Sequence, residues 1–192
     1  SGKGGVGKSI ISANLAVALA DRGYSIAIMD SDLCGPSIPS ILGVNERRLQ
    51  SGPRGMIPPK GPLGVKIMSM AFLLDDDSAV TWLSDLKRIT QEQFLANTDY
   101  GYLDYLIIDM PPGTGSETVN LLRYLPRISG ALIITTPSDI AEHIVHRCIS
   151  LCQKAKTPIM GLIENMSAFI CPHCGKAYMP KHSSGDMLAQ EV

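Results

Sequence analysis

Residues 1–9 are SGKGGVGKS, and this stretch decides the fold of the chain. It matches the phosphate-binding pattern G-x-x-x-x-G-K-[ST], with Gly2, Gly7, Lys8 and Ser9 at the fixed positions. Glycines let the backbone turn its N–H groups towards phosphate oxygens, and the following helix directs its positive end at the same anion. We expect Lys8 to reach the β- and γ-phosphates of ATP and the Ser9 hydroxyl to bind Mg²⁺. The expected nucleotide contacts are Gly2, Lys3, Gly4, Gly5, Val6, Gly7, Lys8, Ser9 and Ile10.

The residues after the loop have the pattern that such a loop requires. Apolar residues recur at helical spacing from residue 8 to residue 22, and Gly23 occupies the position of a helix C-cap. The apolar run at 24–30 then predicts a buried parallel strand that ends in Asp30. Because a phosphate loop connects a strand to a helix, we expect a first strand that precedes residue 1 and is missing here.

Helical and strand patterns alternate along the rest of the chain, which predicts an α/β fold with a doubly wound, mostly parallel sheet. The 192 residues are expected to form a single P-loop ATPase domain. Glycine and proline are frequent at 52–64, which predicts a surface excursion with a hairpin to residues 65–69. The other expected elements are strands at 103–109, 131–136 and 159–165 and a helix over about 138–154.

The composition and charge exclude several classes of protein. Lys and Arg number 17 against 18 acidic residues, so no global field favours nucleic acid or an anionic membrane. No apolar run approaches the ~20 residues that span a bilayer, and no signal peptide is visible. Five cysteines without a secretory signal indicate a reducing compartment, so we expect a cytoplasmic protein.

A second nucleotide-binding element ends at Asp109. Residues 103–109 are LDYLIID, a hydrophobic strand that ends in a carboxylate, which is the Walker B arrangement and brings an acid beside Mg²⁺. An acid at a strand end is common, so the interpretation depends on the phosphate loop upstream. The turn-rich residues 111–115 follow, and we expect them to sense the γ-phosphate.

Two further acids, Asp30 and Asp32, follow the strand at 24–30. Mg²⁺-dependent hydrolysis needs a group that orients the attacking water, and we assign this role to Asp32. Asp30 is closer to the strand and is expected to support the metal ion, as is Asp109, either directly or through water. The alternative is that Asp30 and Asp32 only cap the following turn.

Cys171 and Cys174 have C-x-x-C spacing after a strand and are followed by a glycine. Two thiolates make half of a four-thiolate metal site, and a second copy of the chain would supply the other half on a two-fold axis. A redox C-x-x-C is the rival, but it normally opens a helix in a thioredoxin-like unit, which the sequence lacks. We expect His173 to be exposed and Cys148 and Cys152 to pack as small hydrophobes.

The extra lysine of the loop, Lys3, makes the chain resemble the deviant Walker A ATPases related to MinD, ParA and the nitrogenase iron protein. Within this class it looks most like the Mrp/ApbC group of iron–sulfur cluster carrier proteins. The resemblance covers essentially the whole chain. The stretches that carry it are SGKGGVGKS (1–9), DSDLCGPS (30–37), KIMSM (66–70), LDYLIIDMPPGTG (103–115), GLIENMS (161–167) and CPHCG (171–175).

The resemblance implies roles that spacing alone does not show. Lys3 would reach across an ATP-sandwich homodimer to the partner's phosphates, so Lys3, Lys8 and Asp32 are the expected catalytic residues. Asn165 would contact the adenine base. Cys171 and Cys174 would hold a labile [4Fe–4S] cluster between two subunits, and the cluster would pass to apo-proteins. ATP hydrolysis would be slow and would act as a switch.

The chain also departs from the family pattern. After Trp82 it has Leu83-Ser84-Asp85, where the family usually has Arg-Gly-Pro, so a contact made by that arginine is in doubt. The family continues past the position of Val192 with another strand and helices, so we expect C-terminal elements to be missing as well. Two alternatives remain open: a MinD/ParA-like ATPase that acts in positioning on membrane or DNA, and a structural Zn²⁺ in place of the cluster.

Overall fold

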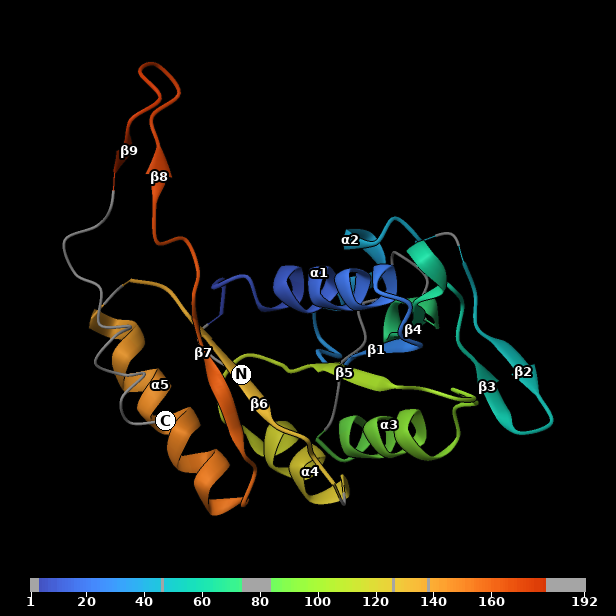
Figure 1. The fold of residues 1–192 in the computed structure, drawn as a ribbon. Helices are drawn as coiled ribbons and strands as arrows, with labels where there is room; N and C mark the ends of the chain where they lie inside the picture. Colours follow the sequence, from blue (N-terminus) through green and yellow to red (C-terminus); the bar gives the residue numbers. More distant parts are fainter. Residues whose placement is uncertain (1–3, 46, 74–83, 126, 138, 179–192) are drawn as a thin grey trace. The chain divides into compact units, whose positions relative to one another are not determined.

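The computed structural model describes residues 4–45, 47–73, 84–125, 127–137 and 139–178, without the side chains of Ser84 and residues 139–142 (Figure 1). These residues fall into two compact units. One unit contains residues 9–111, and the other joins the chain up to Lys8 with the chain from Pro112 onward. Whether these two units together form the expected single domain depends on how they are arranged, so the single domain stays a prediction.

A three-stranded parallel sheet forms the centre of the unit 9–111. Strand β1 (Ile26–Asp30) lies between β4 (Lys66–Met68) and β5 (Tyr105–Asp109). All five β1 residues are buried, as expected for a parallel strand covered on both faces. The strands predicted at 24–30 and 103–109 are therefore confirmed. In the β1–β5 register Asp30 pairs with Asp109, so the carboxyl ends of both strands bring two acids together.

Helix α1 (Lys8–Asp21) packs on this sheet. Ala13 and Ala16 on the helix join Ile26 and Ile28 of β1 in one buried cluster. The helix ends in a Schellman motif, because the N–H of Gly23 donates to the carbonyl of Ala20 at 2.9 Å and the N–H of Tyr24 donates to that of Leu19 at 3.2 Å. Gly23 has a φ of +89°, which confirms the predicted C-cap.

The glycine- and proline-rich excursion differs from the prediction. Its hairpin is formed mainly by β2 (Gln50–Gly52) and β3 (Gly55–Ile57), which pair antiparallel. The predicted pairing with residues 65–69 is reduced to one antiparallel bridge, from Lys60 to Lys66. Residues Lys66–Met68 instead continue as β4 in the parallel sheet, because Ile67 and Met68 are fully buried there beside β1. The other helices described in this unit are the short α2 (Ile38–Ile41), the 3₁₀ turns Pro62–Gly64 and Met70–Phe72, and the longer α3 (Ser84–Ala96).

The second unit is built on a βαβ arrangement. Strands β6 (Ala131–Thr135) and β7 (Ile159–Glu164) pair in parallel and are connected by α5 (Asp139–Lys154), which confirms these three predicted elements. Helix α5 packs Val145, Cys148 and Ile149 against Ile133 of β6. Cys148 and Cys152 are 2% and 8% exposed, as predicted for cysteines that pack as small hydrophobes.

Three further elements complete this unit. Helix α4 (Ser116–Tyr124) follows the loop after β5, and the two-residue strands β8 (Phe169–Ile170) and β9 (Ala177–Tyr178) form an antiparallel hairpin. Figure 1 shows this hairpin extending beyond the end of β7, away from α5. Among the residues that the structure describes, no helix has the length and apolar character needed to cross a membrane.

Candidate functional site

The phosphate loop has the backbone conformation that its glycines predict. Gly5 and Gly7 have φ values of +78° and +89°, in the left-handed region where a Cβ is strained. Val6, between them, is buried, and Lys8 begins α1 with only 9% of its surface exposed. The loop therefore enters the helix as expected for a phosphate site. The predicted contacts Gly2 and Lys3 lie outside the described residues.

Asn165 closes the phosphate loop from the end of β7. Its side-chain amide donates a hydrogen bond of 2.9 Å to the carbonyl oxygen of Val6. A Cβ built on Gly7 would lie 2.5 Å from the Asn165 Nδ2, so this glycine also makes room for the asparagine. The N–H of Asn165 donates to the carbonyl of Thr135 at 2.8 Å, which fixes it at the end of β6. The predicted adenine contact of Asn165 stays a prediction.

Asp109 and Asp30 form a buried acidic pair, with 2% and 1% of their surfaces exposed. Asp109 accepts a hydrogen bond of 3.0 Å from the hydroxyl of Ser12 on α1. Burial, and to a lesser extent the neighbouring charge of Asp109, raises the pKa of Asp30 to about 7, against the lowering effect of the N–H of Ile38. A buried pair of carboxylates is the kind of oxygen site that a divalent cation stabilises, so both residues fit the expected support of Mg²⁺.

The Asp30 carboxylate also holds the backbone that follows β1. Its Oδ2 accepts hydrogen bonds from the N–H groups of Ser37 at 2.9 Å and Ile38 at 3.1 Å, where α2 begins. Its Oδ1 accepts from the N–H of Asp32 at 3.2 Å, and the Ser69 hydroxyl donates to Oδ2 at 3.4 Å. Asp30 thus caps the turn after β1, which was the alternative role expected for this residue. The role of Asp30 at the metal stays a prediction.

Asp32 is half-buried and bonds within its own turn. Its Oδ1 accepts from the N–H of Cys34 at 3.3 Å and from that of Gly35 at 3.2 Å. Both distances are long for N–H···O bonds, so the carboxylate is only weakly engaged. The water-orienting role of Asp32 stays a prediction beside this capping role.

The C-x-x-C pair occupies the turn of the β8–β9 hairpin. The N–H of Gly175, which has a φ of +68°, donates to the carbonyl of Cys171 at 2.9 Å, and the N–H of Cys171 donates to that of Lys176 at 3.0 Å. The backbone N–H groups of Cys174 and then His173 lower the pKa of the Cys171 thiol, because they stabilise its thiolate. Cys174 is exposed, as is His173, in agreement with the prediction for the histidine.

This geometry distinguishes between the two interpretations of the cysteines. A redox pair normally opens a helix, whereas this pair lies in a hairpin turn. In the described part of the chain, no group of three or more His, Cys, Asp or Glu side chains could hold a metal. One chain thus places two cysteine side chains in this turn, and the four-thiolate site shared by two chains stays a prediction.

Sequence reasoning missed three hydroxyl groups and one amide contact at these sites. Ser12 donates to Asp109, Ser69 donates to Asp30, and the Ser31 hydroxyl donates to the backbone carbonyl of Asp109 at 2.5 Å. Serine is common, and no spacing pattern marks these positions as partners of an acid. The bond from Asn165 to Val6 joins residues 159 positions apart, so no local pattern could indicate it.

Comparison with known proteins identifies close relatives. The ParA family, described as "NUBPL iron-transfer P-loop NTPase", matches residues 1–192. The chain is 44% identical over 194 residues to the iron-sulfur cluster carrier protein of Saccharolobus solfataricus, covering 100% of this chain and 66% of that protein. It is 42% identical over 200 residues to the cytosolic Fe-S cluster assembly factor CFD1 of Eremothecium gossypii, covering 100% of this chain and 71% of that protein. The chain thus spans about two thirds of the length of these relatives.

Solved structures show the same fold. The nucleotide-binding protein of Archaeoglobus fulgidus, solved in complex with ADP, is 35% identical with a TM-score of 0.85, over 99% of this chain and 74% of that chain. MinD of Pyrococcus horikoshii, solved with Mg-ADP, is 24% identical with a TM-score of 0.62, over 85% of this chain and 67% of that chain. The second likeness concerns the fold alone. Together they confirm the α/β P-loop NTPase fold that residues 1–9 predict.

Proposed function

Because the chain belongs to the NUBPL-type iron-transfer family of P-loop NTPases, we propose that it is an ATP-dependent iron–sulfur cluster carrier. It binds a labile [4Fe–4S] cluster as cargo, hydrolyses ATP slowly as a switch, and delivers the cluster to apo-proteins. The observation that carries this proposal is the exposed C-x-x-C turn, in which backbone N–H groups lower the pKa of Cys171.

Two copies of the chain hold the cluster. Each contributes Cys171 and Cys174, and the four thiolates match the ligand number of a [4Fe–4S] cluster. The hairpin that carries the pair also exposes apolar side chains: Phe169, Ile170 and Tyr178 are each more than 60% exposed. A second copy would cover these side chains at a two-fold axis, which supports the homodimer.

The nucleotide half of the switch uses the phosphate loop and the buried acids. Lys8 binds the β- and γ-phosphates, and Ser9 with Asp109 would hold Mg²⁺, which would supply positive charge to the phosphates. Asp32 orients the attacking water, and Lys3 acts on the partner's phosphates. Asp30 keeps the turn after β1 in place and supports the metal through water. The left-handed Gly5 and Gly7 and the buried acidic pair support this assignment.

Anaerobic reconstitution with iron and sulfide tests the proposal. We expect about four irons per dimer, the absorbance of a [4Fe–4S] cluster, and loss of both in Cys171→Ser and Cys174→Ser. Cys34→Ser is the matched control, because Cys34 is also exposed but lies in the other unit. A reconstituted dimer that holds only Zn²⁺ and transfers no cluster to an apo-protein would contradict the carrier function and leave the ATPase function standing.

The proposed setting is the cytoplasm, with apo-proteins as partners. The relative in Eremothecium gossypii is named as a cytosolic assembly factor, and the balanced charge of this chain favours neither nucleic acid nor membrane. ATP-dependent binding to DNA or to anionic vesicles would instead support a positioning ATPase of the MinD/ParA kind.

A further inference from the structure

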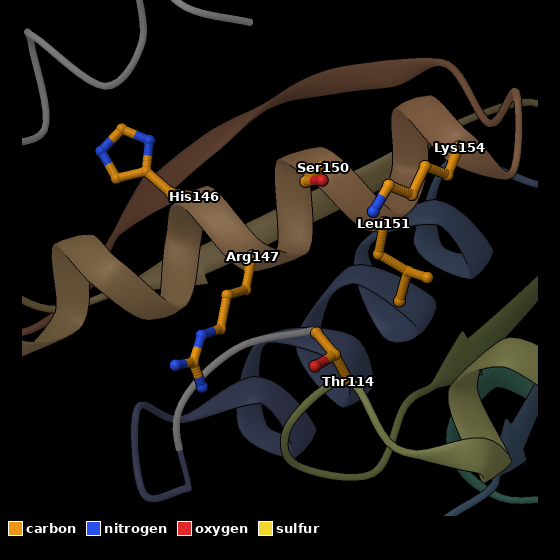
Figure 2. A pocket seen from close by; sticks show the side chains of 6 residues that line it. All are labelled: Thr114, His146, Arg147, Ser150, Leu151 and Lys154. Carbon is orange, nitrogen blue, oxygen red and sulfur yellow. The ribbon is translucent and has the colours of Figure 1, made fainter.

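A basic pocket lies on the exposed side of α5, in the unit that also carries the phosphate loop (Figure 2). The pocket is open and shallow, and its volume is about 410 Å³. Figure 2 shows Arg147 and Leu151 directed from α5 towards the loop of Thr114. The lining residues are Thr114, His146, Arg147, Ser150, Leu151 and Lys154.

The charged side chains that line this pocket are all basic. None of the six lining side chains is acidic, although acids outnumber Lys and Arg in the whole chain by 18 to 17. Arg147 and Lys154 are exposed, and within the described residues neither head group takes part in a hydrogen bond or an ion pair. Folding does not require these cations, because α5 packs on β6 through its other face.

We propose that this pocket, formed by α5 and the Thr114 loop, binds an acidic peptide segment of a partner protein. Arg147 and Lys154 are seven residues apart, which places them ~10 Å apart along a helix. A single small anion would have to draw both side chains together. An extended peptide advances ~3.3 Å per residue and its alternate side chains share one face, so carboxylates two or four residues apart, ~7 or ~13 Å along the peptide, can meet the two cations separately.

The remaining lining side chains fit the same ligand. Leu151 lies between the two cations in the sequence of α5 and offers an apolar contact to the stem of a glutamate. The hydroxyls of Ser150 and Thr114 can donate hydrogen bonds to carboxylate or backbone oxygens. This site goes beyond the proposed function, since it requires neither the cluster cysteines nor hydrolysis.

Fluorescence anisotropy with the full chain tests the proposal. The probe is a labelled ten-residue peptide in which glutamate and alanine alternate, and its counterpart with glutamine is the uncharged control. We expect micromolar binding of the glutamate peptide that weakens with salt, and at least tenfold weaker binding by the double variant R147E/K154E. The conservative variant R147K/K154R should retain most of the affinity.

The matched control is R47E/R48E, which makes the same change of charge on exposed residues of the other unit. Circular dichroism establishes that each variant is folded. The proposal is overturned if the glutamate peptide fails to bind the wild type, or if both double variants bind it equally. It is also overturned if inorganic phosphate or a single-stranded oligonucleotide displaces the peptide at lower concentration than unlabelled peptide does.

Discussion

The side-chain amide of Asn165 donates a hydrogen bond of 2.9 Å to the carbonyl oxygen of Val6. Both residues belong to the same compact unit, so this bond fixes the phosphate loop to the end of β7. The segment that follows Asn165 leads within six residues to Cys171 in the hairpin turn. The loop expected to bind the nucleotide and the cysteine hairpin are thus joined by one short stretch of chain.

Replacement of Asn165 by alanine should weaken ATP binding about tenfold. The bond to Val6 contributes on the order of 1 kcal/mol, and the change leaves a buried carbonyl without this donor. Titration calorimetry with ATP measures the effect. Asn45→Ala is the control, because Asn45 is an exposed asparagine that accepts a hydrogen bond from Ser40 elsewhere in the chain. Equal ATP affinity in wild type and Asn165→Ala would show that the loop does not depend on this contact.

Gly7→Ala should abolish ATP binding for two separate reasons. A φ of +89° strains an alanine by ~1–2 kcal/mol, and its Cβ would lie 2.5 Å from Asn165 Nδ2. Gly5→Ala carries similar strain at +78° but meets nothing within 4 Å, so it should cost less. The double variant Gly7→Ala/Asn165→Ala removes the clash and keeps the strain. It should therefore bind ATP better than Gly7→Ala alone but more weakly than Asn165→Ala, and failure to exceed Gly7→Ala would show that relief of the clash gains no more than the lost bond to Val6 contributed.

Asp32→Ala should leave ATP bound and reduce its hydrolysis at least a hundredfold. The prediction rests on the assignment of Asp32 to the attacking water, while Lys8→Ala should lose both binding and turnover because Lys8 holds the phosphates. Single-turnover measurements with radiolabelled ATP separate the two steps. Asp21→Ala, at an exposed acid at the end of α1, is the control. Full turnover by Asp32→Ala would mean that its bonds to Cys34 and Gly35 are its whole role.

The elements that sequence predicted are those with a local pattern. The phosphate loop and the strand that ends at Asp109 each combine a fixed spacing with an apolar run. The β2–β3 hairpin has neither, because its pairing is supported from a distant segment: the N–H of Met56 donates to the carbonyl of Asn97, and Arg54 forms an ion pair with Asp99 at 3.0 Å. Residues 65–69 were expected beside the excursion because they follow it in sequence. Residues 66–68 instead form β4, because Ile67 and Met68 are buried beside β1.

At the candidate site, too, local patterns were predictable from the sequence and contacts between distant segments were not. An acid at each strand end was predictable, since a hydrophobic run that ends in aspartate is visible in the sequence. The register that places Asp30 opposite Asp109, and the burial of both, are tertiary properties that no single segment specifies. This burial and the neighbouring Asp109 raise the pKa of Asp30, which leads to a prediction that rests on the structure alone.

Asp30 should make the free energy of unfolding fall as the pH rises from about 4 to about 7. Its pKa is about 7 in the folded protein against 3.8 for an unperturbed aspartate, because burial and then the charge of Asp109 disfavour its ionised form. The folded state therefore binds more protons than the unfolded chain within this window. The stabilisation is fully present below the unfolded pKa and is lost as the pH rises through the folded pKa. It amounts to a few kcal/mol at most, at ~1.4 kcal/mol per pKa unit.

Urea unfolding at pH 4.5, 6 and 7.5, without nucleotide and with chelator to remove Mg²⁺, measures this dependence. Asp30→Asn cannot ionise, so its stability should vary less with pH than that of the wild type, whereas Asp21→Asn should match the wild type. Asp109→Asn removes the neighbouring charge and should move the steep part of the curve to lower pH, because the pKa of Asp30 then falls. An unchanged pH dependence in Asp30→Asn would mean that this carboxylate is ionised in the folded protein throughout the range, with the cost of its burial offset by the N–H groups of Ser37 and Ile38.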